Sequence, residues 1–350
     1  MVFQSVPAST RAHRDRLDRI VLAMLLAIRG LWRQLDPTGR DWEQQYAEDL
    51  GPKIYALVLA AQVAATREAD RYVPAVLAEL GILLAPDLPQ VPATAFAGLA
   101  GDGRPAETLL AGTVGRARAS VARRRDEALT PLTDFGPDGE LVEMAPARGS
   151  FDADLAHRLA LQEAEGVLQL LAETVIADTA RAAESAAMTG HPAVQGYYRM
   201  LKPPSCSRCA ILAGRFYRWN DGFPRHPRCD CVHIPAAEAT DDLRLDVEAY
   251  FESLTGQQQD RIFTQSGARA IRDGADPVKV VNARRGMQRA QDGAQAGLLI
   301  TLESTTRRGA ANRRRTGRNA VVRLMPESIY DVAADREDAI RLLRLNGYLT

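Results

Sequence analysis

All four cysteines of the 350-residue chain fall within one short stretch, at Cys206, Cys209, Cys229 and Cys231. The spacing is C-x2-C, then nineteen residues, then C-x-C. A tight turn lets the first pair point two sulfurs at one ion, and residues two apart in an extended segment share a face, so the second pair can supply two more. Four sulfur ligands in a tetrahedral array select zinc. The sequence therefore predicts a structural Zn²⁺ site.

Other arrangements of this cluster remain open. His226 stands beside the second pair and can replace one cysteine as a ligand. The cysteines can also pair as disulfides, or carry no ligand at all. The longest apolar run, 20–28, is too short for a bilayer, which needs about 20 residues, and acidic residues interrupt the basic segment before it. We interpret that run as a buried helix and expect no membrane association, a reduced chain and therefore zinc.

Outside the cysteine cluster the chain has the composition and periodicity of a helical protein. Hydrophobic residues make up 46% of it, enough for a buried core, and aromatic residues only 6%. Helices are predicted over 11–34, 41–80, 105–129, 152–188, 246–254, 257–273, 276–289 and 334–345. Loops are expected at 86–104, 130–150 and 303–320. The predicted fold class is α+β, predominantly helical, with a small zinc-stabilised cysteine-rich knot that carries short strands.

The helical pattern stops at a Gly-His-Pro sequence, 190–192. This change predicts three regions: a helical N-terminal region (1–190), the zinc-knot segment (191–245) and a basic helical C-terminal region (246–350). In the long helix 152–188 an apolar stripe at multiples of four residues is expected to pack on neighbouring helices or on a partner subunit: Leu155, Leu159, Val167, Leu171 and Val175. The other faces of that helix are acidic, and Glu184 is expected in solvent with them.

The C-terminal region concentrates positive charge in a chain whose formal net charge is zero. Between residues 261 and 323 there are fourteen basic and four acidic residues. The densest basic run comprises Arg307, Arg308, Arg313, Arg314, Arg315 and Arg318. Such residues neutralise phosphates without reading sequence, so this run predicts contact with double-stranded DNA. A solvated loop, or docking on an acidic protein surface, is the alternative. No aromatic residue lies between 303 and 320, so stacking on bases is not expected.

The stretch 206–235 resembles the phage Mu F-like, or head-morphogenesis, family of minor head proteins. The shared features are Cys206-x2-Cys209, Gly214, then His226-Pro227-x-Cys229-x-Cys231 and a closing Pro235. Two later segments, 274–287 (GADPVKVVNARRGM) and 323–349, are similar to the branch of that family found in phages of actinobacteria. The resemblance covers roughly residues 190–350. One departure is Asp230, where many relatives carry a basic residue.

This resemblance implies a structural protein of a tailed phage or prophage, present in few copies near the portal. Portal and capsid proteins are then its partners, the virion interior its final place, and the host cytoplasm its place during assembly. No small-molecule substrate is implied. Some relatives are capsid maturation proteases, which is the alternative function. The sequence has no G-x-S-x-G nucleophile motif, and no serine stands in a marked context, so no catalytic residue is assigned.

Overall fold

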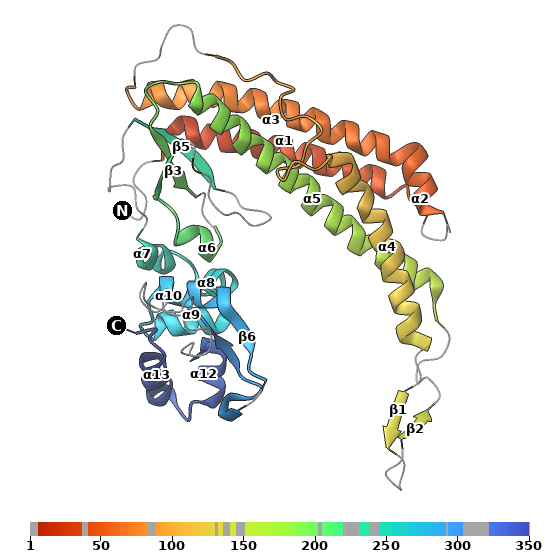
Figure 1. Cartoon of the computed structure of the whole chain (residues 1–350), viewed down its shortest axis with the longest axis vertical. Helices are drawn as coiled ribbons and strands as arrows, with labels where there is room; N and C mark the ends of the chain where they lie inside the picture. The colour runs from red at the N-terminus through yellow and green to blue at the C-terminus, as the bar shows by residue number, and fades with distance from the viewer. Residues whose placement is uncertain are drawn as a thin grey trace, which may run out of the picture.

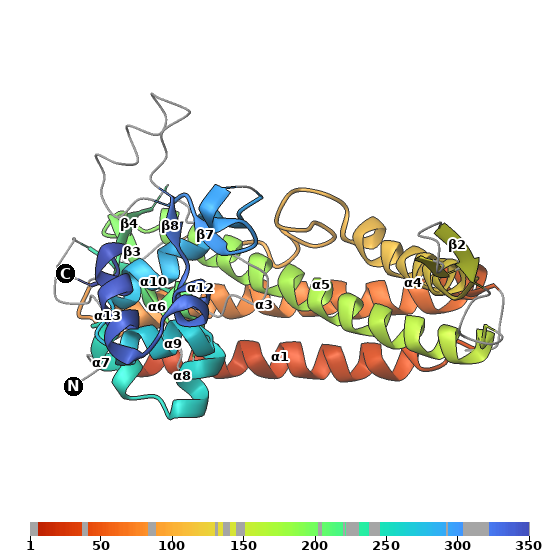
Figure 2. The same cartoon turned by 90° about the horizontal axis from the view of Figure 1, so that it is seen from below.

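Three long helices lie side by side and form an elongated bundle: α1 (Ala8–Trp32), α3 (Gly51–Glu79) and α5 (Ala153–Thr189) (Figures 1 and 2). A short helix α2 (Trp42–Gln45) and a π-helical turn (Tyr46–Leu50) lead into α3. Helix α4 (Ala106–Leu129) packs along the N-terminal half of α5. This computed structural model describes residues 6–36, 41–82, 89–129, 132–135, 141–144, 151–201, 205–219, 221, 231–237, 246–291, 293–303 and 322–349.

Helix α5 packs through a face of small side chains that differs from the predicted stripe. The buried positions follow a four-residue spacing: Ala156, Ala160, Ala164, Leu168, Ala172 and Ile176. Leu155, by contrast, is 46% exposed, and Leu159, Val167 and Leu171 are half-buried. Small side chains let the neighbouring helices approach closely, so the leucines one position earlier lie at the edge of the contact. The prediction found the helix and one buried residue of the stripe, Val175, but placed most of the contact one residue too early.

A three-stranded antiparallel sheet covers one end of this bundle. Strand β3 (Gly196–Met200) is central, between β4 (Phe216–Arg218) and β5 (Val232–Ala236), and the one-turn helix α6 (Ser207–Ala210) follows β3. The sheet shares one hydrophobic core with the ends of α3 and α5, through residues such as Val76, Met188 and Tyr198. The knot segment and the helical region are therefore packed as one body at this end.

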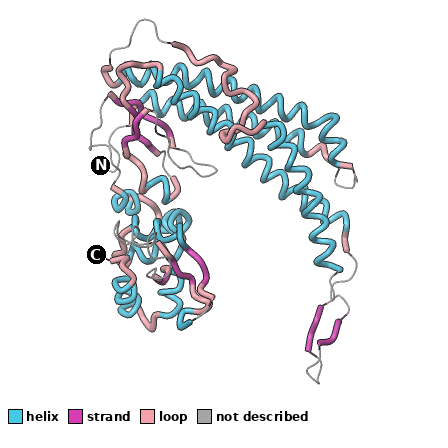
Figure 3. The backbone as a smooth tube through the Cα atoms, in the orientation of Figure 1, coloured by secondary structure: helices cyan, strands magenta, loops and turns pink. Residues whose placement is uncertain are grey.

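The C-terminal lobe extends from the sheet end of the bundle, opposite α4 (Figure 3). Its helices are α7 (Val247–Glu252), α8 (Gly256–Phe263), α9 (Gln265–Arg272), α10 (Pro277–Ala283), α12 (Pro326–Val332) and α13 (Arg336–Leu345), with 3-10 turns at Arg284–Gly286 and Gly293–Gln295. A second antiparallel sheet has the order β6 (Met287–Arg289), β7 (Leu299–Thr301) and β8 (Arg323–Leu324). A separate hairpin, β1 (Leu132–Phe135) and β2 (Leu141–Met144), follows α4. The described chain is mainly helical with small antiparallel sheets, so the α+β class is confirmed.

Several element boundaries differ from the prediction. The single helix expected over 257–273 is two helices, because Thr264 adopts a φ of 68° and starts a new helix. The helix expected over 276–289 ends at Ala283, and its last residues form β6. Helix α12 and the hairpin within 130–150 were not predicted at all. Among the described residues, no helix is long and apolar enough to cross a membrane.

Candidate functional site

Arg199 of β3 lies between two of the four cysteines predicted as ligands. Its Nε donates to Cys231 Sγ at 3.2 Å and its Nη2 donates to Cys209 Sγ at 3.4 Å. The side chain is one of the most buried in the protein, with 1% of its surface exposed. A buried guanidinium requires negative or strongly polar partners, and sulfur atoms at hydrogen-bonding distance supply them here.

Cys206 completes this group from the start of α6. The backbone N–H of Cys209 donates to Cys206 Sγ at 3.4 Å, so this sulfur occupies the N-cap position of the short helix. Each of the three described sulfurs therefore accepts a hydrogen bond from an N–H group. Such donors favour the thiolate form, which is the form that binds soft metal ions.

The structure brings together part of the predicted zinc site. Cys206, Cys209 and Cys231 lie around one end of the β4–β3–β5 sheet, and no disulfide joins any two of these three. Cys229 and the reserve ligand His226 lie outside the described residues. Within the described ranges, no group of three or more His, Cys, Asp or Glu side chains is arranged to hold a metal ion. The chemistry of the three sulfurs suits zinc, and the complete ligand set remains a prediction.

The arginines predicted to contact DNA, Arg307, Arg308, Arg313, Arg314, Arg315 and Arg318, also lie outside the described residues.

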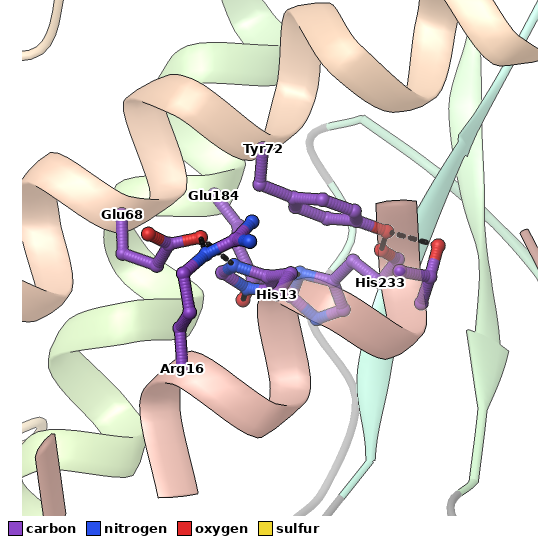
Figure 4. Close-up of polar contacts among 7 residues, drawn as sticks. His13, Arg16, Glu68, Tyr72, Glu184 and His233 are labelled. Atoms are coloured by element: carbon purple, nitrogen blue, oxygen red, sulfur yellow. Dashed lines mark hydrogen bonds and ion pairs between the residues drawn. The ribbon is translucent and has the colours of Figure 1, made fainter. Parts of the chain in front are cut away.

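A buried polar network adjoins the cysteine group where the sheet meets the bundle (Figure 4). His13 of α1 lies between two carboxylates: its Nδ1 is 3.2 Å from Glu68 Oε1 of α3, and its Nε2 is 2.9 Å from Glu184 Oε1 of α5. The second oxygen of Glu184 is 3.1 Å from Nδ1 of His233 on β5. One histidine and one glutamate thus connect all three long helices and the sheet.

Two further side chains complete the network. The Arg16 guanidinium donates to Glu68 at 2.6 Å. The Tyr72 ring stacks on His13 with 4.1 Å between ring centroids, and its hydroxyl donates to the His233 carbonyl oxygen at 2.7 Å. Thr10 donates in turn to the Tyr72 hydroxyl at 2.9 Å. Tyr72 therefore bonds a helix of the bundle directly to the backbone of β5.

The charges of this network stabilise one another. Burial alone lowers the pKa of His13, but hydrogen bonds to Glu184 and Glu68 outweigh it and raise that pKa. Burial alone raises the pKa of Glu184, yet hydrogen bonds from His13 and His233 hold it well below its usual range. Because carboxylates only accept hydrogen bonds, this arrangement favours the imidazolium form of His13, in which both ring nitrogens donate. With both nitrogens engaged, His13 has none left to act as a general base.

The two groups meet on strand β5. Cys231 directly precedes β5, and His233 lies two residues later on this strand, where Arg199 of β3 is paired opposite it. The cysteine group is therefore tied to the position of β5, and β5 is tied to the bundle by Glu184 and Tyr72. No protein-family model, no curated protein and no solved structure matches the chain.

Sequence reasoning missed the residues that hold this site together. Glu184, expected on a solvated acidic face, is only 1% exposed. A signal for it exists: Ala180, Ala183 and Ala187 surround it at helical spacing, which places it on the small-residue face of α5. Nothing in the sequence marks Arg199, since its role depends on a strand pairing between distant segments.

Proposed function

We propose that this protein is a structural minor head protein of a tailed phage or prophage, which acts in head morphogenesis and carries a structural zinc ion. The observation that carries the proposal is the ordered motif of 206–235, with its C-x2-C pair and its HPxCxC segment. Contact with packaged DNA through the arginines at 307–318 belongs to the same proposal.

The fold around the motif supports a structural role. The first cysteine pair lies at helix α6, which follows β3, and Cys231 directly precedes β5, the strand paired with β3. Arg199 of β3 bonds to a sulfur from each end. The sheet is in turn fixed to three helices by a buried charged network. A small segment poor in aliphatic side chains is stabilised in this way against an elongated bundle, whose long surfaces suit contacts with other head proteins.

Zinc would complete this arrangement. Cys206, Cys209 and Cys231 would supply three ligands, and Cys229 or His226 the fourth. When bound, the metal cross-links segments that lack a core of their own, and structural zinc contributes about 10 kcal/mol or more in small domains. Arg199 would offset part of the negative charge of the thiolates.

Metal content tests the zinc site. We expect about one zinc per chain in protein purified without an affinity tag, because a closed site takes one ion. The Cys229→Ala, Cys231→Ala double variant should lose the zinc together with the native near-ultraviolet circular dichroism. Well-folded wild-type protein without metal contradicts the zinc site, and disulfide mapping then identifies how the cysteines are paired.

Particle composition tests the function. The gene is deleted from the phage or prophage that encodes it, and heads are purified with and without complementation. We expect the protein in wild-type heads in far fewer copies than the major capsid protein, and defective heads when it is missing. Absence of the protein from purified heads contradicts the proposal. Uncleaved capsid protein in otherwise complete mutant heads favours the maturation protease instead.

A further inference from the structure

A groove between α1 and α3 gathers four arginines from the two helices. Arg16 and Arg19 of α1 and Arg67 and Arg71 of α3 line it, together with Glu68 and the apolar residues Ile20, Ala23 and Ala64. None of its residues belongs to the 307–318 run or to the cysteine group. From this groove we infer a second, previously unrecognised nucleic-acid contact: a site for the phosphates of a nucleic-acid backbone.

Three of the four groove arginines are not balanced by a neighbouring acid. Arg19, Arg67 and Arg71 are exposed, and they form no ion pair within the part of the chain that the structure describes. Two nearby acids already have other partners. Glu68 is bound by His13 and Arg16 (Figure 4), and Asp18 is paired with Arg14 at 3.0 Å.

Several arginines elsewhere on the described helices have an acidic partner. Examples are Arg118 with Glu43, Arg272 with Asp260, and Arg341 with Asp338. The groove instead gathers three arginines without such a partner, in a chain with no net charge. Like charges three or four residues apart destabilise a helix by about 0.2–0.5 kcal/mol per pair, and both helices carry such a pair here. An anionic ligand would remove that repulsion.

The chemistry of the groove favours phosphate over an acidic protein segment. Guanidinium groups bind phosphate oxygens through two parallel hydrogen bonds, and rows of them on two helices can follow a phosphodiester chain. Binding of a helix from a partner protein depends instead on pockets for large apolar or aromatic anchors. The apolar residues that line this groove, an isoleucine and two alanines, offer no such pocket. Ionic contacts of this kind recognise the backbone without reading sequence.

The test is a binding titration with a fluorescent 30-base-pair DNA of random sequence, measured by anisotropy at several salt concentrations. The groove variant is Arg19→Gln, Arg67→Gln, Arg71→Gln, which leaves the Arg16–Glu68 pair intact. A charge-matched control is Arg33→Gln, Arg116→Gln, Arg125→Gln, three exposed arginines in no ion pair with described residues. Circular dichroism confirms that both variants are folded.

We expect the groove variant to lose roughly tenfold or more in affinity near 100 mM salt, and its log–log salt slope to fall by about 3, since each lost phosphate contact removes about 0.9. The control should bind as the wild type does. Equal binding by groove variant and control overturns the inference, and so does binding of a single nucleotide as tightly as the duplex. Binding of a poly-glutamate peptide is measured in the same way. If the groove variant loses peptide binding and keeps DNA binding, the inference is also overturned and the groove is assigned to an acidic protein.

The same titration with all six arginines of 307–318 replaced by glutamine separates this site from the proposed function. If the 307–318 variant keeps salt-sensitive binding, and the groove substitutions then abolish it, the result supports the groove site. Complete loss of binding on loop replacement alone overturns the groove site and leaves the minor head role standing.

Discussion

Glu184 keeps its charge in the protein interior because histidine rings face both of its oxygens, from His13 on one helix and His233 on the sheet. Replacing it by glutamine leaves the buried His13 imidazolium with one carboxylate in place of two. Removing one partner of a buried ion pair costs about 3–5 kcal/mol, so we expect Glu184→Gln to lower the free energy of unfolding by that amount in urea titrations. Glu127→Gln, the same change at an exposed site on α4, should stay within about 0.5 kcal/mol of wild type. Equal stabilities for the two variants would show that the network contributes little.

The pH dependence of stability follows from the same residue group. The pKa of His13 is raised above its usual 6.5 by Glu184 and Glu68 in spite of burial, so its contribution is present below pH 6.5 and is lost as the pH rises through the folded-state value. Burial alone raises the pKa of Glu68, but hydrogen bonds with His13 and Arg16 lower it, and its contribution disappears instead as the pH falls below about 4.5. Burial lowers the pKa of His191, so the contribution of that residue to stability has the opposite pH dependence. To isolate His13, the free energy of unfolding in urea is measured for wild type and for His13→Gln, and the difference between them is taken at each pH. That difference should shrink from pH 6 to pH 9. A constant difference would mean that His13 is neutral.

At the scale of elements, strand β3 depends on a glycine at the point where β4 approaches it. A Cβ on Gly196 would lie 2.1 Å from the Tyr217 carbonyl oxygen and 2.4 Å from the Phe216 ring. Gly196→Ala must therefore push β4 away, and we expect a loss of about 1–3 kcal/mol in the free energy of unfolding. In the middle of α5, nothing lies within 4 Å of the Cβ position of Gly166, and Gly166→Ala should stabilise by about 0.5–1 kcal/mol. Thermal unfolding compares the two variants, and a stable Gly196→Ala variant would show that the strands are farther apart.

Local signals predicted most of the helices and few of their contacts. Periodic apolar residues indicated the long helices, because this pattern acts within a few residues of the chain. The break at Thr264 escaped prediction, since a positive φ at threonine is uncommon and its hydroxyl is held by Arg284 from another helix. Four cysteines in a short stretch predicted a shared site. Arg199 could not be predicted, because it reaches the sulfurs only through strand pairing.

At the scale of the whole molecule, the predicted boundary at residue 190 crosses a hydrophobic core. The ends of α3 and α5 pack against the sheet through Val73, Val76, Leu77 and Met188, all buried. A fragment of residues 1–190 would expose this apolar surface together with the Glu184 network. Buried apolar area contributes about 25 cal/mol per Å², so we expect the fragment to bind the dye ANS, to self-associate and to unfold at a lower temperature than the full chain.

A fragment of residues 1–245 is the control for this prediction, because it keeps β3, β4 and β5 over the same surface. It should bind less ANS than the 1–190 fragment and remain closer to monomeric in analytical ultracentrifugation. If both fragments are equally monomeric and equally stable, the bundle is an independent domain and the sheet is an appendage to it. If only the longer fragment is monomeric and stable, the cysteine segment is part of the bundle's own fold. If the proposed zinc ion is bound, its loss would then be transmitted through β5 to the three long helices.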